Sequence, residues 1–123
     1  MLKDDFFTIK GKESSGDGQV TYHVELNADH AIFKGHFPGN PISPGVCNIG
    51  MIKACAEEEI GASLFIGNMK QVKFSHLITP TENKELDIEL KIDATDSEAI
   101  KLVAAIVKDG TKFMDIKAEA RKE

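Results

Sequence analysis

The sequence has no long apolar run and no excess of basic residues. No stretch approaches the about 18 consecutive apolar residues that a membrane-spanning helix needs, so we expect no membrane segment. The 123 residues carry a net charge of −5, and no stripe of basic side chains is available to neutralise phosphates. We therefore do not expect a general nucleic-acid-binding protein.

Cysteine is scarce, and its spacing excludes one kind of cross-link. Cys47 and Cys55 both fall in a segment with a helical pattern. One helix would separate them by roughly 12 Å, at about 1.5 Å per residue, which is too far for a disulfide. Residues 1–5 also lack the basic-then-apolar pattern of a signal peptide. Unpaired cysteines and no export signal indicate the reducing cytoplasm.

Metal and nucleotide signatures are lacking too. His23 and His76 have no metal-ligand spacing to one another or to the cysteines, and no nucleotide-binding motif occurs. We therefore predict neither a metal nor another cofactor.

What the sequence does contain is an ordinary globular composition, with 41% apolar and 28% charged residues. The length suits one domain, residues 1–123, and no linker or repeat interrupts it. Val20, Tyr22 and Val24 alternate with polar residues, which is the period of a half-buried strand. The expected elements are strands at residues 6–12, 19–26, 63–75 (broken at 67–68), 86–92, 99–107 and 111–120, and a helical turn at 30–33.

The longest apolar pattern, residues 46–60, follows a segment that is dense in proline. Three of the four prolines, at positions 38, 41 and 44, restrict the backbone there. We predict that Ser43 is the N-cap of a helix, that Pro44 is its first residue, and that it ends near Gly61. A helix that is apolar nearly all round must be surrounded, so we expect an α+β fold with an antiparallel sheet around it. A partner subunit would cover the side that remains.

Two motifs around this helix start resemble a known family. Residues 35–41 read Gly-His-Phe-Pro-Gly-Asn-Pro, and Pro-Gly-Val follows at 44–46. This pattern is similar to the signature of the β-hydroxyacyl-acyl-carrier-protein dehydratases, which are hot-dog-fold enzymes of fatty acid and related polyketide synthesis. The order of expected elements agrees with that family over almost the whole chain. The resemblance implies a hot-dog fold, an antiparallel sheet wrapped around one long buried helix.

The resemblance also implies a reaction, the elimination of water from a 3-hydroxyacyl thioester. That reaction needs a base, an acid and a group that stabilises the enolate-like charge. The family's histidine matches His36, whose neutral imidazole would be the base; the alternative is a loop histidine that satisfies buried carbonyls. The amide at the helix start matches Gly45, where free N–H groups and the helix dipole would polarise the thioester carbonyl. The residues expected at the substrate are Phe37, Pro38, Gly39, Val46 and Gly50.

One catalytic group of the family is missing. Its members carry an Asp or Glu fourteen positions after the histidine, which serves the histidine of the other subunit, but residue 50 is glycine. Glu57 would lie about 10 Å further along the helix, beyond reach, and Lys53 is a cation. Gly50 has two simpler explanations, close packing of two helices or a wider acyl tunnel.

Other polar residues of this region have structural explanations. We expect Cys47 to be a core residue rather than a nucleophile. His30 is expected to cap or pack, and residues 57–59 to form the solvated end of the helix.

Three functions remain open. We favour a dehydratase-like lyase, because the loop and the helix start are intact. The others are a catalytically reduced acyl-binding subunit that pairs with an active paralogue, and an acyl thioesterase. The expected partner is an acyl carrier protein with a phosphopantetheine-linked chain, docking on a basic patch with Lys70, Lys73 and Lys101 as candidates. We expect a homodimer, or a heterodimer with a related subunit.

Overall fold

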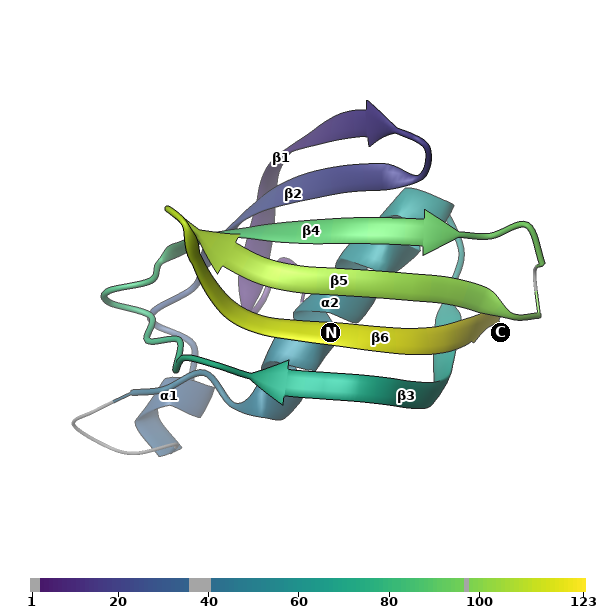
Figure 1. The fold of residues 1–123 in the computed structure, drawn as a ribbon. Helices are drawn as coiled ribbons and strands as arrows, with labels where there is room; N and C mark the ends of the chain where they lie inside the picture. The colour runs from purple at the N-terminus through teal and green to yellow at the C-terminus, as the bar shows by residue number, and fades with distance from the viewer. Residues whose placement is uncertain (1–2, 36–40, 97) are drawn as a thin grey trace.

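The computed structural model describes residues 3–35, 41–96 and 98–123 as one sheet and two helices (Figure 1). In chain order the elements are β1 (Phe7–Gly16), β2 (Gln19–Leu26), α1 (Ile32–Gly35), α2 (Gly45–Ile60), β3 (Leu64–Phe74), β4 (Glu85–Asp93), β5 (Ile100–Lys108) and β6 (Thr111–Lys122). The six strands form a sheet in the order β1-β2-β4-β5-β6-β3, and every neighbouring pair is antiparallel. Strands β1 and β3 are therefore its edges.

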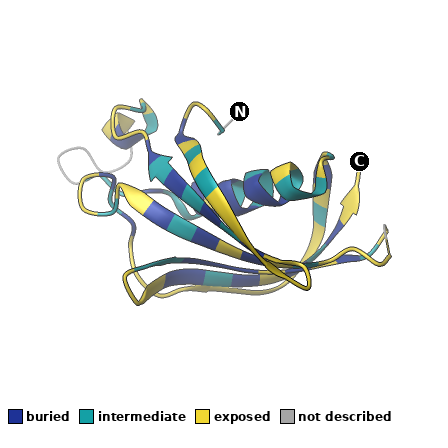
Figure 2. Ribbon diagram, turned by 90° about the horizontal axis from the view of Figure 1, so that it is seen from above, coloured by how far each residue is buried: buried dark blue, intermediate teal, exposed yellow. Residues whose placement is uncertain are grey.

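Helix α2 crosses one face of this sheet (Figures 1 and 2). The side chains of Met51, Ile52 and Cys55 are fully buried between helix and strands. The other side of the helix is only partly covered, and Val46 at its start is 75% exposed. The expected arrangement of an antiparallel sheet around a long helix is confirmed. Among the described residues, no helix has the length and apolar character needed to cross a membrane.

The alternation expected for the strands holds in the sheet. Val20, Tyr22 and Val24 of β2 point into the core, whereas the residues between them are partly exposed on the outer face. The same pattern continues across β4 and β5, because antiparallel register places inward residues opposite inward residues. The central core residues from β4, β5 and β6 are Leu86, Ile88, Leu90, Leu102, Ala104, Ile106, Met114, Ile116 and Ala118.

The first hairpin is longer than predicted. Strand β1 continues through the polar residues to Gly16, and the turn is limited to Asp17 and Gly18. Both turn residues have positive φ, +52° and +77°, which favours the tight turns of hairpins. A side chain at Gly18 would collide with the carbonyl oxygen of Ile92, which lies beside it. Pairing with β2 therefore extends the strand beyond its apolar pattern.

The predicted start of the long helix is wrong by one residue. Pro44 is the N-cap, with extended angles of φ −61° and ψ 146°, and no side chain caps the helix. The Ser43 hydroxyl instead donates to Oδ1 of Asn48 at 2.5 Å, and its amide donates to the Ile78 carbonyl at 2.8 Å. The end is as predicted: Gly61 adopts φ +77° and donates its amide to the Glu57 carbonyl.

The interpretation of residues 57–59 as a solvated helix end is confirmed for Glu58, whose side chain is 46% exposed, but all three carboxylates also have partners. The Glu57 carboxylate accepts the Leu64 amide at 2.7 Å, at the start of β3. Glu58 pairs with Lys3 at 2.8 Å. Glu59 accepts the Tyr22 hydroxyl at 2.8 Å and pairs with Lys12 at 3.1 Å. The three carboxylates thus connect the end of α2 to the two edges of the sheet, at the start of β3 and near β1 and β2.

His23 carries a cross-strand ion pair on the outer face of the sheet. Its Nδ1 lies 2.7 Å from Oδ1 of Asp87 on β4, and its Nε2 lies 3.1 Å from Oε1 of Glu13 on β1. The hydrogen bond to Asp87, and then that to Glu13, raise the pKa of the His23 imidazole above its usual value. The folded state therefore favours the protonated ring.

We predict that this cluster makes stability depend on pH. Because the folded-state pKa of His23 is raised, its contribution is complete below the unfolded pKa of about 6.5 and is lost as pH rises through the folded value. In His23→Gln, the free energy of urea unfolding should fall less than in the wild type between about pH 6 and pH 9. The effect should be small, because the side chain is 38% exposed and solvent screens both pairs. Identical pH profiles for the two proteins would contradict the assignment.

Candidate functional site

The amino end of α2 is the part of the predicted site that the structure describes. His36, Phe37, Pro38 and Gly39 lie outside the described residues. The other predicted site residues, Gly45, Val46 and Gly50, all lie on the first two turns of α2. The position of the predicted base relative to the helix therefore stays a prediction.

Backbone donors are free at this helix start. The amides of Cys47 and Asn48 both bond to the Pro44 carbonyl, at 3.0 and 3.1 Å. Those of Gly45 and Val46 have no hydrogen-bond partner within the described parts of the chain. Unpaired amides and the positive end of the helix dipole favour a negatively charged or carbonyl oxygen at this point. The chemistry predicted for Gly45 is thus available to it.

A pocket of about 330 Å³ opens beside these amides. Gly45 and Asn48 form one wall, and the other is formed by Phe74 at the end of β3 and by residues 75–78 of the β3–β4 connection. The Phe74 ring lies directly over Gly45, where an added Cβ would be 3.0 Å from its Cζ atom. Glycine therefore allows this close approach. The full lining is Ser43, Gly45, Asn48, Phe74, Ser75, His76, Leu77 and Ile78.

Two polar residues are buried in this wall. Ser43 is 4% exposed and Asn48 is 5% exposed, and they bond to one another through the Ser43 hydroxyl and Asn48 Oδ1. Sequence reasoning missed Asn48, which looked like an isolated polar residue in an apolar helix. It also missed His76 as a pocket residue, because only the folded chain brings the β3–β4 connection to the helix start.

No carboxylate of α2 replaces the one missing at position 50. Gly50 and Lys53 are partly exposed on the helix. The Glu57 carboxylate is already bonded to the Leu64 amide. Among the described residues of α2, the only other carboxylates are those of Glu58 and Glu59, which are paired with Lys3 and Tyr22 at its far end. The helix thus has donors at its start but no acid near its second turn.

The remaining candidates have structural roles. Burial raises the pKa of the Cys47 thiol, and raises that of Cys55 to about 12, so both are poor nucleophiles. His30 accepts the Ile32 amide at the start of α1 through Nδ1, at 3.1 Å. Its ring also packs edge-on against Phe6, with centroids 5.5 Å apart. The capping and packing role predicted for His30 is confirmed.

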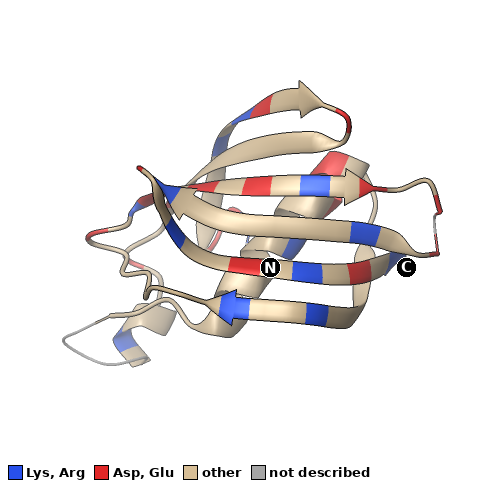
Figure 3. Ribbon diagram, viewed as in Figure 1, with Lys and Arg blue, Asp and Glu red and all other residues tan. Residues whose placement is uncertain are grey.

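The three candidate docking lysines do not form one group. Basic and acidic residues are interspersed on β4 and β6, whereas β3 carries lysines and no acidic residue (Figure 3). Lys70 of β3 pairs with Glu119 at 2.9 Å, and Lys101 of β5 is the register partner of the same glutamate. Lys73 is exposed and directly precedes the pocket residue Phe74. Of the three, Lys73 is therefore next to the pocket.

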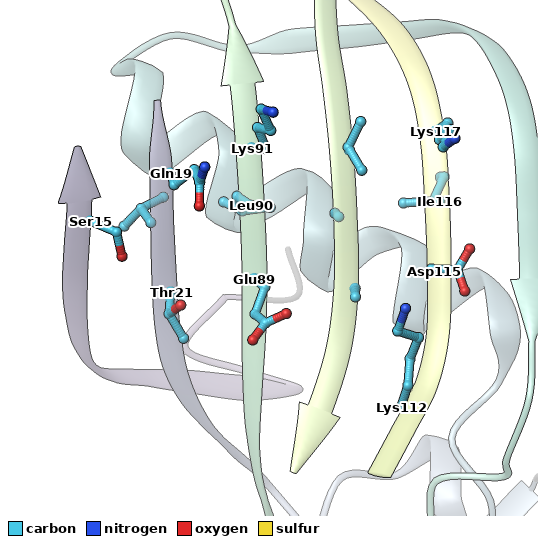
Figure 4. Close-up of a pocket in the computed structure, with 14 residues that line it drawn as sticks. Ser15, Gln19, Thr21, Glu89, Leu90, Lys91, Lys112, Asp115, Ile116 and Lys117 are labelled. Carbon is cyan, nitrogen blue, oxygen red and sulfur yellow. The ribbon is translucent and has the colours of Figure 1, made fainter. Parts of the chain in front are cut away.

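A wider hollow, of about 480 Å³, lies on the outer face of the sheet (Figure 4). It forms because Ala105 of β5 is small and lies between its register partners Glu89 and Asp115. Charged side chains of both signs surround it, including Lys112 and Lys117. Of the predicted site residues that the structure describes, Gly45, Val46 and Gly50, none lines this hollow, and the sheet separates it from α2. We therefore place the candidate site in the smaller pocket.

Comparison with known proteins decides the family. The model of the ApeI-like family, described as ApeI dehydratase, matches residues 12–114. The chain belongs to the ApeI-like dehydratases. This membership confirms the resemblance that the motifs at 35–41 and 44–46 indicated.

Individual relatives agree with this family. The chain is 30% identical over 93 residues to the 3-hydroxyacyl-[acyl-carrier-protein] dehydratase FabZ of Levilactobacillus brevis, a match that covers 70% of this chain and 62% of that protein. The ApeI-like chain thus spans less than two thirds of the length of this relative.

Solved structures confirm the hot-dog fold. The dehydratase heterocomplex ApeI:P of Xenorhabdus doucetiae superposes with a TM-score of 0.73 at 18% identity, over 93% of this chain and 96% of that one. A putative thioesterase from Ralstonia eutropha JMP134 superposes with a TM-score of 0.62 at 15% identity, over 95% and 85% of the two chains. At these identities the likeness shows the fold alone.

Proposed function

We propose that this chain is a lyase that eliminates water from 3-hydroxyacyl thioesters carried by an acyl carrier protein. The observation that supports it most is the Gly45 amide, which has no hydrogen-bond partner among the described residues and lies at the wall of a partly apolar pocket. The chain also belongs to a dehydratase family. The amide would polarise the thioester carbonyl, which acidifies the neighbouring C–H bond. Phe74, Leu77 and Ile78 offer apolar surface for the acyl chain.

His36 is the proposed base. A neutral imidazole accepts a proton near neutral pH, and the enolate-like charge that results would be held at the helix start. The substrate is proposed to contact four further residues beside the base and the helix start: Phe37, Pro38, Gly39 and Val46. The proton for the departing hydroxyl would come from water or from a more distant group, because Gly50 supplies none.

The same glycine supports a second candidate function. A chain without the helix carboxylate can act as an acyl-binding subunit that lends its histidine to an active paralogue. The superposition with a protein described as a dehydratase heterocomplex makes this the nearest alternative. A thioesterase has less support, since those enzymes generally also use a helix carboxylate.

The proposed assembly is a dimer of this chain. The edge strand β3 exposes Phe65, Met69 and Phe74, which are about half exposed, and Val46 at 75% and Leu77 at 68% lie near its end. An edge strand also has unpaired backbone groups. Self-pairing of an antiparallel edge gives a two-fold interface in which both copies use the same surface. The pocket residues Phe74 and Leu77 would then lie at the interface.

We predict that the wild type is a dimer at micromolar concentration. Met69→Lys should shift it to a monomer in multi-angle light scattering, because a charge replaces an apolar side chain that is 49% exposed on the edge. The matched control is Val103→Lys on β5, 43% exposed in the single chain and away from this edge, which should stay dimeric. The homodimer would be contradicted if the wild type is a monomer. It would also be contradicted if the wild type forms a dimer only when a second, different hot-dog chain is present.

The proposed reaction is tested with the purified chain and His36→Ala. The wild type should convert a 3-hydroxyacyl thioester to the enoyl product, measured by ultraviolet absorbance. The variant should lose this turnover while its melting temperature stays within a few degrees, since a base carries chemistry more than stability. Turnover at the wild-type rate in His36→Ala would show that the histidine is structural.

Restoring a carboxylate tests position 50. Gly50→Glu should raise dehydratase activity at least about tenfold, since a positioned general acid contributes roughly 10²–10⁴-fold. Loss of a mid-helix glycine favours the helix by up to ~1 kcal/mol, against about 1–3 kcal/mol for overpacking. Gly50→Gln is the matched control, because it has the same size without the acid. Equal rates in both folded, dimeric variants would show that position 50 does not face the reacting hydroxyl.

A further inference from the structure

Asn48 presents a polar group that the proposed reaction has not used. Asn48 is only 5% exposed, and it lines the pocket at the start of α2. Its Oδ1 accepts the Ser43 hydroxyl. Its Nδ2 group has no hydrogen-bond partner among the residues that the structure describes. Every fully buried side-chain nitrogen or oxygen of those residues does have a partner. The Nδ2 group is therefore not fully buried, and the pocket that Asn48 lines is the open space beside this residue.

Helix geometry brings this group to the Gly45 amide. Residues three apart lie on one face of a helix, and the Cα–Cβ bond tilts toward the amino end. The Asn48 side chain thus leans back toward the turn on which Gly45 lies, and both residues line the same pocket. Two N–H donors of different origin, backbone and carboxamide, face one space.

Ser43 fixes the orientation of the carboxamide. Because the hydroxyl occupies Oδ1, the group that remains for a ligand is a donor and not an acceptor. The Ser43 amide is itself bonded to the Ile78 carbonyl, and Ile78 is 1% exposed. The residue that holds Asn48 is therefore anchored to the opposite wall of the pocket.

We propose that Asn48 is a second donor, with the Gly45 amide, to the carbonyl oxygen of the acyl thioester. This inference rests on the proposed function for its ligand class. A pair of N–H donors on apolar walls suits one oxygen at the end of an apolar chain. The stabilisation that these two hydrogen bonds provide increases as negative charge develops on that oxygen. Asn48 acts here on the carbonyl and takes no part in moving the proton.

The test compares two ligands that differ at that oxygen. Calorimetry would measure binding of S-butyryl pantetheine, a thioester, and of S-butyl pantetheine, a thioether without the carbonyl. The wild type should prefer the thioester about tenfold or more. Asn48→Leu should lower that preference about fivefold, the value of one hydrogen bond. It should lower kcat about 10²-fold, as loss of an oxyanion donor does.

Two further variants separate recognition from folding. Ser43→Ala with Asn48→Leu removes both partners of the buried bond, which is better tolerated than removing one, and should show the same loss of preference. Asn27→Leu is the control, because the Asn27 carboxamide bonds to the Asp29 amide and the Asp5 carbonyl, and Asn27 does not line this pocket. It should keep the thioester preference even if its melting temperature falls.

Each outcome separates this inference from the proposed reaction. An unchanged preference in Asn48→Leu and in the double variant overturns the role of Asn48, whether or not the protein is a dehydratase. So does a wild type that binds the two ligands equally. A preference that Asn48 controls, in a wild type without dehydratase turnover, overturns the proposed reaction and leaves the carbonyl site in place.

Discussion

The packing of α2 against the sheet is the contact on which the rest of the structure depends. The side chains of Met51, Ile52 and Cys55 have no exposed surface. If the helix left the sheet, exposing each of them to water would cost roughly 1–3 kcal/mol of hydrophobic free energy. Because this face is fixed, the amino end of the helix has a defined position beside the β3–β4 connection. The free amides and the pocket both follow from that placement.

The fold was predictable because its signals are periodic and local. Alternation on β2 and β4 and the end of α2 at Gly61 each depend on a few neighbouring residues. The family followed from short motifs for the same reason. Even so, β1 runs past its apolar pattern, since strand pairing rather than side-chain character sets its length.

The site was only partly predictable, and its missed features share a physical cause. Ser43 before Pro44 has the composition of a helix cap, yet its hydroxyl bonds to Asn48 and its amide to a residue 35 positions later, Ile78. His76 comes to the pocket through the same connection. The carboxylates of residues 57–59 also have partners that local spacing does not reveal: the Leu64 amide, Lys3, and Tyr22 with Lys12. Contacts of this kind leave no trace in local spacing.

The bond between Tyr22 and Glu59 gives the protein an intrinsic optical reporter. The chain has one tyrosine and no tryptophan, and that tyrosine is fully buried on β2 with its hydroxyl on the last turn of α2. Burial raises the pKa of the phenol further from neutrality, so its ionisation does not interfere. Near-ultraviolet signals of this ring therefore arise at the junction of helix and sheet, where its hydroxyl donates to the Glu59 carboxylate. Separation of the two layers can be followed at one natural residue, without a label.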